Sequence, residues 1–191
     1  MRFVFNLLAM LVVALGTGFG LSYMALSDTG LLGGLHSGPW VAWPDVGTPN
    51  PNPYTRAHLA RQAKLQLGQS EGLQFVASTD GNGVALDLAC TYHLSGFTPV
   101  ATLWTLVALD PEGINLARPG TSGWIGSNQL SRNEDGSFTL YIGSRLEPHN
   151  WLEVGGSGPF VLSLTLYDTV AASGLSSAEI AMPTVTRVQC S

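Results

Sequence analysis

Charge is scarce in this chain of 191 residues. Charged side chains make up 11% of the sequence, lysine occurs once, as Lys64, and the formal net charge is −5. A nucleic-acid-binding surface needs clustered basic side chains that neutralise phosphates. The composition therefore excludes a nucleic-acid reader and predicts no nucleic-acid partner.

Motifs that carry catalysis or hold a cofactor are also missing. The sequence has no G-x-S-x-G nucleophile elbow and no phosphate-binding glycine loop that leads into a helix. Asp80, Asn82 and Asp87 resemble a calcium loop, but Thr91 stands where the twelfth-position glutamate is needed. The four histidines do not have metal-ligand spacing: His36, His58, His93 and His149. We therefore expect no metal or cofactor and assign no catalytic residue.

Cysteine is almost absent, with only Cys90 and Cys190. Cys90 shares strand parity with Tyr92, and Cys190 shares it with Val188, so we expect both sulfurs to point toward a core. Outside the cytoplasm such a pair is most simply a disulfide, and that setting favours a bridge over a catalytic thiol. We predict a Cys90–Cys190 bond.

One long hydrophobic run lies at the N-terminus. In residues 3–26, Asn6 is the only strongly polar residue before Ser22, and at about 1.5 Å per residue the run could cross a hydrocarbon core of about 30 Å. Arg2 precedes the run and no lysine or arginine follows before Arg56, which predicts an N-terminus in the cytoplasm and the remainder outside. A cleaved signal peptide is the alternative, but its apolar core is usually shorter and ends in a small-x-small site.

The segment around the expected membrane boundary has two features with alternative readings. Gly16 and Gly20 have the GxxxG spacing of helix dimers, although glycine is common in membrane helices generally. Residues 28–53 are rich in glycine and proline, which favours an extended linker. Within it, Trp40 and Trp43 would lie at the membrane interface or cover an edge of the domain.

Residues 54–67 predict one amphipathic helix. Asn52 can cap it, Pro53 suits its first position and Gly68 suits its end. Its apolar stripe consists of Ala57, Ala60, Ala63 and Leu67. Its basic residues would face an anionic ligand, a lipid headgroup or only solvent: Arg56, Arg61 and Lys64.

From residue 73 onward the chain alternates between strand patterns and turns. In residues 160–167, Phe160, Leu162, Leu164 and Leu166 share one face, so we expect this strand inside a sheet. Seven or eight strands are expected, which suits a β-sandwich or jelly roll. The other strands are expected at 73–78, 90–95, 101–110, 123–130, 138–142 and 180–189.

A set of aromatic residues could line a ligand cleft for a sugar or an apolar molecule, although aromatic side chains in a small β domain more often form the core. The set is Tyr92, Trp104, Tyr141, Trp151 and Tyr167. A hydrolase would instead need several acidic or histidine side chains to converge. The candidates for that role are Asp110, Glu147, His149, Glu153 and Asp168.

Several short motifs follow one another along residues 36–190. They are, in order, Asn52-Pro53-Tyr54, Arg56-Ala57, Ala60, Glu71, Phe75, Asp80-Gly81, Cys90-Thr91-Tyr92, Trp104-Thr105-Leu106, Asp135-Gly136-Ser137, Asn150-Trp151-Leu152 and Leu164-Thr165-Leu166-Tyr167. In these motifs the chain resembles the DUF1214 family, and most closely its short, membrane-anchored bacterial members that lack a DUF1254 domain. The resemblance implies a jelly-roll-like β-sandwich and no established activity. Thr165 stands where longer members tend to have arginine, so any site built on that arginine would be missing.

Together these patterns predict a membrane anchor over 1–27, a linker over 28–53 and a β-sandwich over 54–191. We expect a single-pass protein of the bacterial inner membrane with its C-terminal domain in the periplasm. The domain would be a non-enzymatic binding or structural module with an unknown protein or small-ligand partner, and a homo-oligomer is compatible with the sequence. The alternative is a cleft hydrolase or carbohydrate-acting enzyme.

Overall fold

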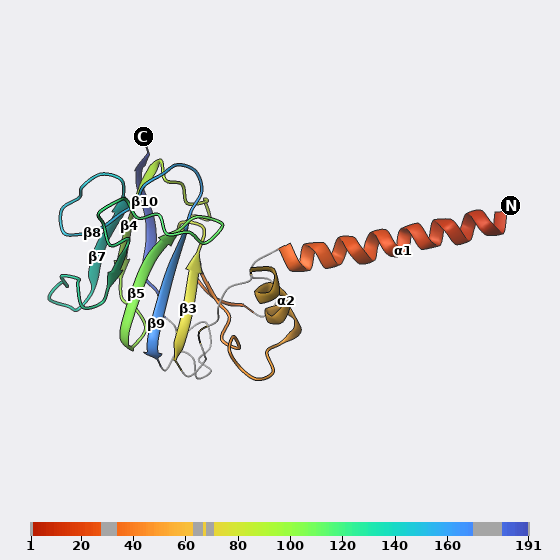
Figure 1. Ribbon diagram of the computed structural model, residues 1–191, viewed down its shortest axis with the longest axis horizontal. Helices are drawn as coiled ribbons and strands as arrows, with labels where there is room; N and C mark the ends of the chain where they lie inside the picture. Colours follow the sequence, from red (N-terminus) through yellow and green to blue (C-terminus); the bar gives the residue numbers. More distant parts are fainter. Residues whose placement is uncertain (1, 28–33, 63–66, 68–70, 170–180, 191) are drawn as a thin grey trace.

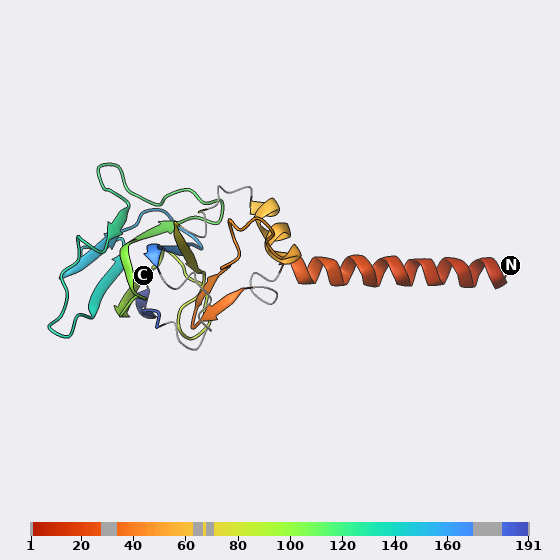
Figure 2. The ribbon, with the colours of Figure 1, turned by 90° about the horizontal axis from the view of Figure 1, so that it is seen from below.

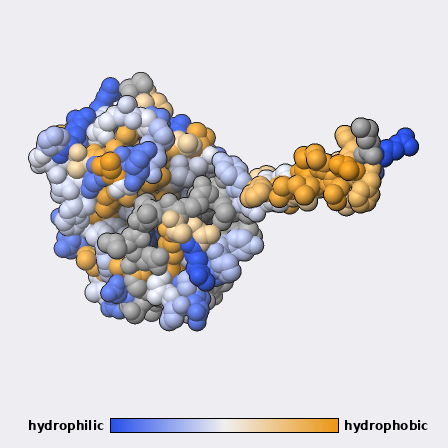
Figure 3. All heavy atoms as spheres, turned by 45° about the vertical axis from the view of Figure 1, so that its right-hand side comes forward, coloured by the Kyte–Doolittle hydropathy of each residue, from blue (hydrophilic) through white to orange (hydrophobic). Residues whose placement is uncertain are grey.

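The computed structural model describes residues 2–27, 34–62, 67, 71–169 and 181–190. A long helix, α1 (Arg2–Ser27), extends from a body of strands (Figures 1 and 2). Its side chains from Arg2 to Met24 are all exposed. This stretch is long and apolar enough to span a membrane, and Figure 3 shows it as a mostly apolar rod. The body therefore leaves the apolar surface of α1 uncovered.

Two sheets form the body. The six-stranded sheet has the order β1 (Leu35–Ser37), β2 (Trp40–Ala42), β3 (Gly72–Ala77), β9 (Val161–Thr169), β5 (Ala101–Leu109) and β6 (Trp124–Gly126). The four-stranded sheet has the order β10 (Thr184–Cys190), β4 (Cys90–Gly96), β7 (Phe138–Gly143) and β8 (Asn150–Glu153). Neighbouring strands are antiparallel except β7 and β8. The predicted mainly β class is confirmed, whereas the strand order does not confirm a jelly roll.

Strand β9 lies between β3 and β5, as its alternating sequence predicts. Leu162, Leu164 and Leu166 are almost fully buried on its inner face. Tyr92 and Leu140, on β4 and β7, belong to the same apolar core. The inner faces of the two sheets therefore enclose one core, and burying each large apolar side chain contributes about 1.5–3 kcal/mol.

Part of the expected linker belongs to the sheet. Strands β1 and β2 pair with each other, and β2 pairs with β3. Trp40 is fully buried, and its indole N–H donates to the carbonyl of Pro183 at 2.7 Å. Trp40 is thus a core residue and not a membrane-interface residue, because one hydrogen bond and the core satisfy both its polar and its apolar parts.

Helix α2 (Pro53–Gln62) begins where the sequence predicts. The Asn52 side-chain oxygen accepts hydrogen bonds from the N–H groups of Tyr54 and Thr55, both at 2.9 Å, which confirms the predicted cap. Its expected C-terminal end at Gly68 lies outside the described residues. The predicted alanine stripe is wrong in part, because Ala60 is exposed while Thr55 is fully buried.

The Cys90–Cys190 disulfide is present, as predicted. The two residues face each other across β4 and β10. The expectation that both sulfurs point to the core is wrong for Cys190, which is exposed. The register of β10 against β4 shifts between Arg187 and Gln189, so strand parity counted through Val188 does not hold past this bulge.

Two buried tryptophans give a matched test of the core. The indole N–H of Trp40 has an acceptor, whereas that of Trp104 is buried without a hydrogen-bond partner among the described residues. Trp40→Phe leaves the buried carbonyl of Pro183 without its hydrogen-bond donor. Trp104→Phe removes an indole N–H that has no acceptor. We expect Trp40→Phe to cost about 1–3 kcal/mol more than Trp104→Phe in urea unfolding. Equal losses would contradict this account.

Candidate functional site: the outer face of the four-stranded sheet

The structure divides the five aromatic residues predicted to line a cleft. Tyr92 and Trp104 are buried in the core. Tyr167 lies on the outer face of the six-stranded sheet, because its neighbour Leu166 points inward. Tyr141 and Trp151 are direct cross-strand partners on β7 and β8. Only these last two form a partly exposed pair.

His93 extends this pair into a row across three strands. It is the cross-strand partner of Tyr141, and the two ring centroids are 5.2 Å apart. The Trp151 indole N–H donates to the carbonyl of Gly143 at 3.1 Å, which holds its ring in place. We call His93, Tyr141 and Trp151 the aromatic row. At a strand spacing of about 4.8 Å, its three rings form a strip about 10 Å long.

A small cavity lies next to the aromatic row, at the disulfide end of the sheet. Its volume is about 120 Å³, below the roughly 300–1,000 Å³ of ligand pockets, so it can hold only a substituent of a larger ligand. The cavity lies beside the aromatic row, because Thr91, which lines the cavity, shares the outer face of β4 with His93. The cavity is lined by Ala89, Cys90, Thr91, Ser144, Arg145, Gln189 and Cys190.

The aromatic row and this cavity together form what we call the outer-sheet site. Little charge surrounds it. Arg145 lines the cavity, and Glu153 on β8 is 3.2 Å from Arg118 in a surface ion pair. A site of this composition suits an uncharged, polar ligand with apolar faces.

The residues that a hydrolase would need lie apart. Asp110 follows β5 and Asp168 lies near the end of the antiparallel β9, so they occupy opposite ends of the six-stranded sheet. Asp168 accepts a hydrogen bond from Thr102 at 2.8 Å, and Glu153 pairs with Arg118. No hydrogen bond or ion pair of the described residues joins any two of the five candidates. In that part of the chain, no three His, Cys, Asp or Glu side chains cluster as metal ligands.

Sequence reasoning places His93 on the polar face of its strand but does not pair it with Tyr141. The pairing depends on the register between β4 and β7, which are separated by more than forty residues. Strand periodicity gives the face of a residue and not its cross-strand partner. The pairing of Tyr141 with Trp151 on the parallel strand β8 cannot be predicted from the sequence for the same reason.

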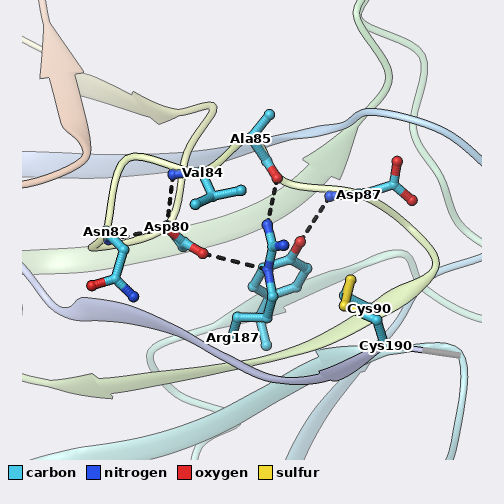
Figure 4. A network of polar contacts seen from close by, with 9 residues as sticks. Asp80, Asn82, Val84, Ala85, Asp87, Cys90, Arg187 and Cys190 are labelled. Atoms are coloured by element: carbon cyan, nitrogen blue, oxygen red, sulfur yellow. Dashed lines mark hydrogen bonds and ion pairs between the residues drawn. A yellow bond between two sulfur atoms is a disulfide. The ribbon is translucent and has the colours of Figure 1, made fainter.

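A second polar cluster fixes the connection between β3 and β4 (Figure 4). Asp80, which is 3% exposed, accepts hydrogen bonds from the N–H groups of Asn82 and Val84, both at 3.0 Å. Arg187 of β10 places its Nε 3.4 Å from the Asp80 carboxylate and donates to the carbonyl of Ala85 at 2.7 Å. The Arg187 Nε makes an ion pair with Asp80 but has no hydrogen-bond partner among the described residues. All of these contacts lie within the fold, which indicates a structural role.

The carboxyl of Asp135 has a lowered pKa, because the hydroxyl and the N–H of Ser137 donate hydrogen bonds to it. Asp135 is exposed in the turn before β7. These bonds close the turn that the Asp135-Gly136 sequence indicates.

The architecture is that of a domain of two facing β-sheets, preceded by an apolar helix. The sequence profile described as "Protein of unknown function (DUF1214)" matches residues 71–171, which is more than half of the chain. The chain therefore belongs to the DUF1214 family. No curated protein matches the sequence.

Two solved bacterial structures align with parts of this chain. The VPA0106 protein from Vibrio parahaemolyticus aligns over 74% of this chain and 36% of its own, with a TM-score of 0.59 and 19% identity. A putative uncharacterized protein from Burkholderia cenocepacia aligns over 63% of this chain and 30% of its own, with a TM-score of 0.43 and 15% identity. This chain thus spans about a third of the length of each. The first similarity supports the fold alone.

Proposed function

We propose that this protein is a membrane-anchored, extracytoplasmic binding module that carries out no chemistry of its own. The uncovered apolar surface of α1 supports an anchor, because such a surface is stable only in a bilayer or against another apolar surface. The disulfide supports an oxidising compartment outside the cytoplasm. The proposed location, in a bacterium with two membranes, is the periplasm, with the body attached to the inner membrane.

The ligand that the outer-sheet site suits best is an uncharged oligosaccharide, and the aromatic row is the observation that carries this proposal. The apolar faces of sugar rings stack on aromatic side chains, while their hydroxyl groups need polar partners. Tyr141 and Trp151 supply adjacent partly exposed rings. Thr91 and Gln189, which line the cavity, supply hydrogen-bonding groups for one ring substituent.

Calorimetric titration of the full-length protein in detergent, with N-acetylglucosamine oligomers and cello-oligosaccharides, tests this proposal. Trp151→Ala and Tyr141→Ala should each weaken binding by about tenfold or more, because truncated aromatic contacts at binding sites cost more than 1 kcal/mol. Trp124→Ala is the matched control, because Trp124 is 40% exposed on β6 of the other sheet. It should bind as the parent does.

Two results would contradict the proposal. One is the absence of saturable binding to either oligosaccharide series at millimolar concentration. The other is equal weakening by Trp124→Ala and Trp151→Ala. Release of shorter sugars during the titration would support a carbohydrate-acting enzyme in place of a binding module.

A further inference from the structure

Helix α2 lies at the end of α1 that joins the body. Both ribbon views place α2 beside this end, and the two helices contact each other (Figures 1 and 2). If α1 spans a bilayer, this is the level at which the chain leaves the hydrocarbon core. Helix α2 is therefore the part of the body nearest to the lipid headgroups.

The start of α2 is fixed to the body by Asp45. One carboxylate oxygen of Asp45 accepts hydrogen bonds from both the backbone N–H and the side-chain amide of Asn52, each at 2.7 Å. The other accepts the hydroxyl hydrogen of Thr55 at 2.7 Å. Asp45 lies three residues after β2, so these bonds tie the first turn of α2 to the sheet.

The chain around α2 is basic, although the protein is acidic. Between Asp45 and Glu71 there is no acidic residue, while the chain as a whole has a net charge of −5. Arg56 and Arg61 both lie within α2, and Arg56 is exposed. Arg118 and Arg187, by contrast, are in ion pairs within the body. The element that meets the anchor thus carries two arginines and no acidic residue.

We propose that α2 rests, through the exposed side chain of Arg56, on the anionic phospholipid headgroups of the bilayer that α1 spans. The inference depends on the anchor proposed above. Basic side chains near an anionic surface each favour the bound state by about fivefold. Strands β7 and β8 lie on the side of the body opposite α1 (Figures 1 and 2). Docked this way, the protein presents Tyr141 and Trp151 away from the membrane.

Fluorescence quenching in nanodiscs tests this arrangement on the full chain. A fluorophore is attached at Ala60→Cys, an exposed position on α2, or at Glu134→Cys, in the turn before β7. Both natural cysteines are paired, so each label is specific. The discs contain phosphatidylcholine with or without phosphatidylglycerol, together with a lipid that carries a nitroxide on its headgroup.

We expect phosphatidylglycerol to increase quenching of the Ala60→Cys label and to leave the Glu134→Cys label unchanged. Arg56→Gln should lower the ratio of docked to undocked protein by about fivefold. About 1 M NaCl should act in the same way, because it shortens the screening length to about 3 Å. The charge-matched control is Arg132→Gln, at an exposed arginine outside α2 and outside the outer-sheet site, and it should have no effect.

Three outcomes would overturn the inference: no difference between the two lipid mixtures, equal quenching at both labels, or an equal loss in the Arg132→Gln control. Failure of the chain to insert into discs would overturn the anchor as well. The two failures are distinguishable, because an uninserted protein does not co-purify with discs. A loss of oligosaccharide binding alone would leave the lipid contact standing.

Discussion

Replacing Cys90 and Cys190 with serine should lower the free energy of unfolding by up to about 4–5 kcal/mol. The bond closes a separation of 100 residues, and the chain-entropy model assigns a large stabilisation to loops of this length. It also holds the end of β10, an edge strand, against β4. Without it, β10 keeps its backbone ladder, Val185 in the core, the contacts of Arg187 and the hydrogen bond from the N–H of Gly81 to the carbonyl of Val185.

Urea unfolding of the full-length protein in detergent, followed by tryptophan fluorescence, measures this loss. The parent protein treated with a thiol reductant should lose as much stability as the double-serine variant. The same reductant should leave the double-serine variant unchanged, which separates the bond from side effects of the reagent. A loss below about 1 kcal/mol would mean that β10 is held mainly by its packing.

Seven of the ten strands were predicted from the sequence, whereas β1, β2 and β8 were not. Strand β9 has four apolar residues at every second position, and it lies in the interior of its sheet as expected. Strands β1 and β2 have only three residues each, too few for periodicity to be visible. Their surroundings contain many prolines, so propensity favours a linker there. The burial of Trp40 overrides that preference, because tertiary contacts outweigh weak local signals.

The candidate site was only half predictable from the sequence. Alternation correctly places Tyr92 on the core-facing side of its strand, together with Leu94, so periodicity already separates Tyr92 from a cleft. Residues 101–110 are apolar on both faces, so periodicity does not assign a face to Trp104, and Trp151 lies in β8, which was not expected as a strand. The pairing of His93, Tyr141 and Trp151 across three strands depends on the register between strands, which the sequence does not give.

The second large loss of stability is expected on substitution of Arg187, which joins the β3–β4 connection to the last strand. Arg187→Met should cost about 3 kcal/mol, because it leaves the carboxylate of Asp80 buried without its counter-charge. The same substitution removes the donor to the Ala85 carbonyl and a guanidinium whose carbon lies 5.6 Å from the Tyr92 ring centroid. The methionine side chain still covers Tyr92, so loss of packing is small.

Asp80→Asn removes the negative charge of Asp80 but keeps the acceptor for the hydrogen bonds of its turn, so it tests the charge alone. The remaining carboxamide oxygen can still accept the N–H groups of Asn82 and Val84, and Arg187 has a side chain that is 29% exposed and can be partly solvated by water. We therefore expect Asp80→Asn to cost clearly less than Arg187→Met. Asp80→Ala removes the acceptor for both N–H groups as well, and its cost should approach or exceed that of Arg187→Met.

A double-mutant cycle between Asp80→Asn and Arg187→Met isolates the ion pair. The two residues are in contact, so their effects should be non-additive by about 1 kcal/mol or more. Urea unfolding of the parent, both single variants and the double variant measures this coupling, with Arg132→Gln as a control for the loss of one exposed arginine. Additive losses would show that Arg187 acts only through Ala85 and Tyr92. In that case the position of Asp80 would be set by the hydrogen bonds of its own turn, and the last strand would be attached to the β3–β4 connection mainly by the hydrogen bond from the N–H of Gly81 to the carbonyl of Val185.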